Sequence, residues 1–221
     1  MLRYTAYFFS VLFHPLLIPT YMLILLLMVN PYTFGVNTIG ESKFLIAQMV
    51  LTTIFLPLFS VFMLKQLDFI SSLEMPKREE RIAPYLIIGM FYIGLAVFFI
   101  KSPSIIPSVL SIAFLGATIA LWILFVMNLF IKISAHTVGI GGLLGMVIIG
   151  TFQFDYKQFM MELGPLGIFT VNMNSILMIC IFIAGLVGTS RLILKAHTKH
   201  EVYLGYLIGF VSQFVAYNFL A

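Results

Sequence analysis

The chain has 221 residues, of which 62% are hydrophobic and only 9% are charged, and its mean hydropathy is +1.11. This composition excludes a soluble domain, and continuous apolar runs near the roughly 18 to 20 residues that cross a bilayer predict membrane-spanning helices. The formal net charge is +4, and a single cysteine, Cys180, excludes disulfides and cysteine-based metal sites within one chain.

Seven apolar runs follow one another along the chain and predict an all-α, polytopic integral membrane bundle of six or seven transmembrane helices. The first is too long for a signal-peptide core, so we expect a retained helix. Because proline removes a backbone donor, we expect kinks at Pro15, Pro19 and Pro57. We expect one transmembrane domain over residues 1–221. The predicted spans are 7–29, 44–64, 85–100, 105–130, 138–154, 166–189 and 202–220.

The polar residues gather in three connections, after the second, fourth and sixth spans, which share a side with the N-terminus. Nine of the twelve lysines and arginines lie on this side. The positive-inside rule places it in the cytoplasm of a multi-pass protein, which we expect in a bacterial inner membrane, although a phosphate site would collect the same residues. Membrane lipids with anionic head groups are the expected partners, and nucleic acid is not.

The third polar connection, 190–201, carries the most informative spacing. His197 and Glu201 are four residues apart, so on a helix the carboxylate reaches the imidazole and holds it in one tautomer. This arrangement suits a nucleophilic or acid/base histidine. Arg191 offers a fork of donors that fits phosphate or carboxylate oxygens. The alternative is a solvated helix start with an ordinary surface ion pair.

The second polar connection places Ser134 and His136 at the start of a glycine-rich apolar run. Ser134 is typical of a helix N-cap, and the free N–H groups that follow form an anion site. His136 could donate a proton to a leaving oxygen. The alternative is a simple cap beside an interfacial polar residue. The glycines at 139, 141, 142 and 145 indicate close helix packing.

A further histidine, His14, precedes Pro15 in the first span, on the polar side. Two interpretations are open for it. It either lines the site or bonds to a neighbouring helix or to a backbone group that the proline frees.

Together these residues resemble the type 2 phosphatidic acid phosphatase family, within the vanadium haloperoxidase-like superfamily. Its third motif, Ser-Arg, five residues, His, three residues, Asp, is matched in spacing by Ser190-Arg191, His197 and Glu201, with Glu for Asp. Its second motif, Ser-Gly-His, is similar to Ser134-Ala135-His136. Its first, Lys, six residues, Arg-Pro, is represented only with compressed spacing, by Lys77, Arg78, Arg81 and Pro84. The phosphatase-like core covers roughly residues 65–205.

The resemblance implies an integral membrane phosphatase that hydrolyses a lipid phosphate or isoprenyl diphosphate through a phosphohistidine on His197. Glu201 would orient His197, and His136 would protonate the leaving group. The resemblance also implies no metal and no cofactor, since fixed cations can compensate the phosphoryl charge. The implied phosphate-binding residues are Arg191, Lys77, Arg78, Arg81 and Ser134.

Two alternatives stay open beside the phosphatase. A catalytically inactive or transport-type membrane protein would use the same residues to bind anionic lipid head groups. An unrelated transporter or assembly factor would use the polar cluster as a proton or ion relay.

Overall fold

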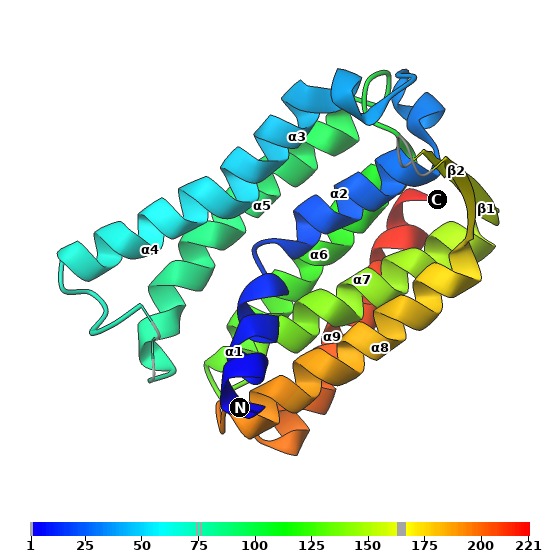
Figure 1. The fold of residues 1–221 in the computed structure, drawn as a ribbon. Coiled ribbons are helices and arrows are strands. Elements are labelled where there is room, and N and C mark those ends of the chain that lie inside the picture. The colour runs from blue at the N-terminus through cyan, green and yellow to red at the C-terminus, as the bar shows by residue number, and fades with distance from the viewer. Residues whose placement is uncertain (1, 74, 76, 163–166) are drawn as a thin grey trace.

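The computed structural model, which describes residues 2–73, 75, 77–162 and 167–221, is a bundle of membrane-length helices (Figure 1). Among these residues, six helical segments are long and apolar enough to cross a membrane, which confirms the predicted all-α, multi-pass class. The later spans are single helices: α5 (Ile82–Lys101), α6 (Ser108–Asn128), α7 (Ala135–Phe152), α8 (Met173–Ile193) and α9 (Lys199–Leu220).

The first predicted span is not one helix. It is broken into α1 (Leu2–Leu12) and α2 (Ile18–Val29), and neither part reaches the length of a spanning helix. The break lies at Pro15, because a proline lacks an N–H donor and disfavours the helical conformation at the residue before it. The predicted span 7–29, in which a kink is expected at Pro15, is therefore two helices and not one kinked helix, and the described residues form six continuous spans preceded by a broken one.

The second span is a long helical segment with an internal irregularity. It begins after short 3-10 turns at Pro31–Phe34 (η1) and Ile39–Ser42 (η2), and comprises α3 (Lys43–Val50), a π-helical turn (η3, Leu51–Phe55) and α4 (Leu56–Gln66). Pro57 lies in the first turn of α4, directly after the π turn. The irregularity expected at this proline therefore takes the form of a π turn. A further 3-10 turn, η4 (Glu79–Arg81), leads into α5.

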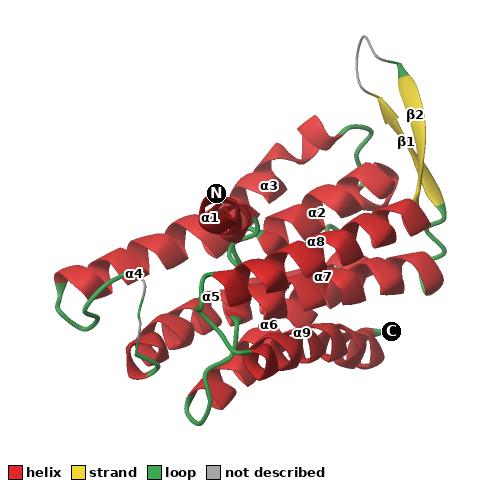
Figure 2. Ribbon diagram, turned by 60° about the horizontal axis from the view of Figure 1, so that its bottom comes forward, coloured by secondary structure: helices red, strands yellow, loops and turns green. Residues whose placement is uncertain are grey.

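A β-hairpin replaces the start of the sixth predicted span. Strands β1 (Gln158–Glu162) and β2 (Ile168–Asn172) pair antiparallel, with Gln158 opposite Asn172. Helix α8 begins only at Met173, because the Asn172 side chain accepts the Asn174 N–H at 2.8 Å and caps it. The prediction of a helix from residue 166 is thus wrong, and the hairpin projects away from the helices (Figure 2).

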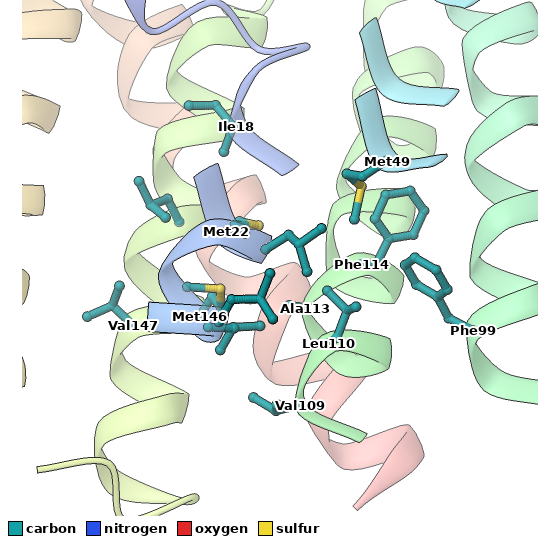
Figure 3. Packing of buried hydrophobic residues seen from close by; sticks show 14 of the residues in the cluster. Ile18, Met22, Met49, Phe99, Val109, Leu110, Ala113, Phe114, Met146 and Val147 are labelled. Atoms are coloured by element: carbon teal, nitrogen blue, oxygen red, sulfur yellow. The ribbon is translucent and has the colours of Figure 1, made fainter. Parts of the chain in front are cut away.

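The core lies where α2, α6 and α7 meet, with α3 against α2 and α5 against α6 (Figure 3). Helices α7 and α9 approach so closely that glycine is required. A Cβ on Gly209 would collide with the Val138 carbonyl oxygen, and one on Gly145 would lie 3.0 Å from the Phe210 carbonyl oxygen. The packing role predicted for the α7 glycines is confirmed at Gly145 and also at Gly141, which faces the Tyr206 backbone.

The chain topology brings the three polar connections to one end of the bundle. In Figure 1 the α4–α5, α6–α7 and α8–α9 connections lie at the lower end, together with the N-terminus, whereas the hairpin and the C-terminus lie at the upper end. The antiparallel order of the helices thus gathers residues that are far apart along the chain, as the sequence predicts.

Candidate functional site

The polar end of the bundle contains a cavity of about 1160 Å³, lined by residues of α1, α2, α4, α5, α6 and α7 and of the end of α8. Its apolar lining comes mostly from α2, α4, α5 and α6. Its described lining residues include no aspartate or glutamate. The basic side chains and histidines that line it are Arg3, His14, Arg81, Lys132, His136, Arg191 and His197.

The turn between α8 and α9 delivers His197 to this cavity. Just after α8 ends, Lys195 adopts the left-handed conformation, with φ of +53°, an uncommon geometry for a non-glycine residue. Helix α9 then begins with a capping box, in which Thr198 and Glu201 satisfy each other's backbone N–H groups. The end of α8 and the capped start of α9 thus hold His197 between two helix ends.

His197 is paired with Glu201, as the four-residue spacing predicts. Its Nδ1 lies 2.7 Å from Glu201 Oε2, and its side chain is 3% exposed. Because a carboxylate only accepts, Nδ1 carries the proton of the neutral ring and Nε2 keeps its lone pair. Burial lowers the pKa of His197; Arg191 and Lys132 add to this lowering, whereas the bond to Glu201 opposes it. The ring is therefore neutral near pH 7, with a free nucleophilic nitrogen.

Arg191, in the last turn of α8, is held by a residue from the other end of the chain. Its Nη1 donates to Ser10 Oγ of α1 at 3.2 Å. Its Nε is buried and has no hydrogen-bond partner among the described residues. A buried guanidinium donor without a partner costs free energy unless a ligand supplies an acceptor.

His136 and Ser134 lie at the start of α7, where the predicted cap forms. The Ser134 side chain accepts the Thr137 N–H, but the residue is fully buried and does not line the cavity. His136 does line it, and its Nε2 lies 3.0 Å from the Ser10 carbonyl oxygen. Since a carbonyl only accepts, Nε2 carries a proton, and Nδ1 is the atom left to exchange one. The Ser134 N–H donates to the Glu201 carbonyl at 3.4 Å, which joins the two connections.

Two further cations face the same space. Burial and the nearby Arg81 lower the pKa of Lys132, Arg191 adds to this, and Glu201 opposes it. Such mutual repulsion indicates that this end of the cavity is positive. Arg81, a residue of the compressed first motif, lies here and donates from Nε to the Met75 carbonyl at 3.0 Å. Lys132 was not among the predicted site residues, although it stands two positions before Ser134.

Pro84 of the first motif also lines the cavity, but the remaining two residues of that motif, Lys77 and Arg78, lie elsewhere. Lys77 is exposed and does not line the cavity. Arg78 also lies outside it, because its Nη1 donates to the Phe130 carbonyl at 2.7 Å and its Nε pairs with Glu79 at 3.0 Å. These bonds tie the α4–α5 connection to the end of α6, which is a structural role.

Among the described residues, no group of three or more His, Cys, Asp and Glu side chains is placed to hold a metal ion. The chain matches no known family model, no curated protein and no solved structure.

Proposed function

We propose that the chain is an integral membrane phosphatase that hydrolyses a lipid phosphate or isoprenyl diphosphate in the manner of the type 2 phosphatidic acid phosphatases. The observation that carries this proposal is a carboxylate-held histidine, His197, that lines one positive cavity with a second histidine and with Arg191, a half-buried arginine whose buried Nε lacks a partner among the described residues. Phosphoryl transfer through a covalent intermediate requires a neutral nucleophile, a proton donor and cations that bind the phosphate. In this proposal they are His197, His136 and Arg191.

In this mechanism the Nε2 lone pair of His197 attacks phosphorus, and the bond from phosphorus to the leaving oxygen breaks. His136, doubly protonated when the phosphate dianion is bound beside it, donates its Nδ1 proton to that oxygen and becomes neutral, while its Nε2–H stays on the Ser10 carbonyl. Glu201 stabilises the cation that the phosphorylated ring becomes. Water then attacks the phosphohistidine, His136 takes a proton from it, and orthophosphate leaves from His197.

The remainder of the cavity supports an amphiphilic substrate. The wall formed by α5 and α6 is buried, whereas the wall formed by α1 and α4 is open: Tyr7, Leu58 and Phe62 are 63%, 53% and 45% exposed although they line the cavity. An apolar space that opens sideways at the depth of a spanning helix is suited to a hydrocarbon chain coming from the bilayer. In this proposal the positive end lies on the cytoplasmic face of a bacterial inner membrane.

A second candidate is a protein that binds anionic lipid head groups without hydrolysis. This candidate is favoured because three of the predicted phosphate-binding residues do not line the cavity. Ser134 is buried at the N-cap of α7, and Lys77 and Arg78 lie outside the cavity. In that case the pair of His197 and Glu201 would serve binding alone.

The test is release of orthophosphate from dodecyl phosphate and farnesyl diphosphate in vesicles that contain EDTA. We expect turnover by the wild-type chain, an acid-labile phosphoenzyme, and a loss of at least about 1000-fold in His197→Ala. The matched control is His200→Ala, because His200 is exposed and does not line the cavity. Full turnover in His197→Ala would refute the mechanism, and binding of dodecyl phosphate without turnover would establish the second candidate.

A further inference from the structure

The break between α1 and α2 places a residue in the cavity that lies outside the phosphatase-like region 65–205. His14 stands in the turn between the two helices, half-buried, and lines the cavity. Its ring lies beside that of His136, with centroids 5.3 Å apart and planes at 81°. The same end of α1 provides both Ser10 contacts, to Arg191 and to His136. The N-terminal segment is thus built into the site.

The hydrogen bonds of His14 define which of its nitrogens can act. The Leu16 N–H, which Pro15 leaves outside a regular helix, donates to His14 Nδ1 at 3.4 Å. A nitrogen that accepts a hydrogen bond carries no proton, so the neutral ring is protonated on Nε2. No hydrogen bond joins Nε2 to another of the described residues. The ring therefore presents one N–H donor to the cavity that it lines.

We propose that His14 is a further phosphate-binding residue, whose Nε2–H donates to a phosphoryl oxygen held at Arg191. This inference rests on the proposed phosphate site but not on hydrolysis, because a non-hydrolysing lipid-binding protein would use the same donor. His14 is not the proton donor of the reaction, because its Nδ1 accepts from the Leu16 N–H and is not free to take up a second proton. His136, with Nδ1 left to exchange a proton, keeps that role.

Two substitutions at this position separate binding from a purely local role. His14→Asn places a side-chain oxygen near the Nδ1 position, which retains the acceptor for the Leu16 N–H, but it lacks a donor at the Nε2 position. His14→Gln extends its amide to the Nε2 position and gives up the Nδ1 acceptor. A phosphate-binding role therefore predicts that Asn is the damaging change, whereas a turn-capping role predicts that Gln is.

The experiment is titration of the full chain in detergent with inorganic phosphate, followed by calorimetry, with thermal unfolding measured on each variant. We expect His14→Asn to weaken phosphate binding about tenfold and His14→Gln to remain within about threefold of the wild type, as loss of one hydrogen bond to a charged group requires. Asparagine at wild-type affinity, or glutamine as weak as asparagine, would overturn the assignment.

A wild-type chain that binds phosphate but releases none from dodecyl phosphate would refute hydrolysis and leave the His14 comparison fully readable. A wild-type chain that binds neither inorganic phosphate nor dodecyl phosphate would overturn both proposals.

Discussion

Replacing Glu201 by glutamine removes the charge beside His197 and keeps the shape of the side chain. The lost interaction is a 2.7 Å hydrogen bond to a ring that is 3% exposed. A hydrogen bond to a charged group contributes about 1.5–3 kcal/mol, and a neutral one about half of that. The difference, about 0.8–1.5 kcal/mol, predicts a fall in turnover of roughly four- to tenfold, because the phosphohistidine cation loses its counter-charge.

The same change has a predicted effect on pH dependence. The bond to Glu201 raises the pKa of His197 against the stronger effect of burial, so glutamine should lower that pKa further. Since the nucleophile must be neutral, the acid limb of kcat/KM should move to lower pH. The measurement is phosphate release from dodecyl phosphate across the acid limb, from a pH below the lowered pKa of His197 to neutral pH. Substrate ionisation is common to both proteins and leaves their difference unaffected.

The control is Thr198→Ala, which breaks the capping box and leaves the pair of His197 and Glu201 in place. It should lower the free energy of unfolding by about 1 kcal/mol, with little change in turnover. Wild-type turnover and an unmoved acid limb in Glu201→Gln would refute the orienting role. An equal loss of turnover in Thr198→Ala would show that the start of the helix matters and the charge does not.

Two further predictions concern the cavity and the packing of the helices. Ala117→Phe fills part of the apolar lining, so it should raise the KM for dodecyl phosphate several-fold and leave the KM for phenyl phosphate unchanged. Ala47→Phe, at an exposed position of α3 outside the lining, should change neither KM value. Equal KM values for dodecyl phosphate in the wild type and both variants would contradict a chain-binding cavity. Gly209→Ala should lower the free energy of unfolding in detergent by about 1–3 kcal/mol, because the new Cβ would meet the backbone of α7. Gly185→Ala is the control, because its Cβ would face open space, and it should leave the free energy of unfolding unchanged. Indistinguishable thermal unfolding of the two variants would contradict the close contact between α7 and α9.

The spans could be predicted because hydropathy over about 20 residues is a property of the sequence alone. The start of α8 could not, because Ile168, Phe169 and Val171 are apolar in a strand as they would be in a helix. The signal that ends the strand is local and weak: Asn172 caps α8 through one hydrogen bond. The break after α1 had a clearer signal in Pro15, which indicated a kink but not its extent.

In the candidate site, too, some contacts could be predicted from the sequence and others could not. The four-residue spacing predicted the pair of His197 and Glu201, but not its setting: His197 lies just before the Thr198 N-cap, and Glu201 reaches it from the first turn of α9. The contact of Arg191 with Ser10 joins residues 181 positions apart, and no local pattern encodes it. The places of Lys77 and Arg78 could not be predicted either, because a connection between two helices is arranged by the bonds that it makes, here to the end of α6.

The open wall between α1 and α4 places the cavity in contact with two phases at once. In the proposed phosphatase, a substrate that arrives sideways would be supplied from the two-dimensional pool of the bilayer, whereas orthophosphate would depart into water. The rate should then follow the mole fraction of substrate among the lipids rather than its bulk concentration. Diluting a fixed amount of dodecyl phosphate with inert phospholipid would slow the protein, and adding buffer would not.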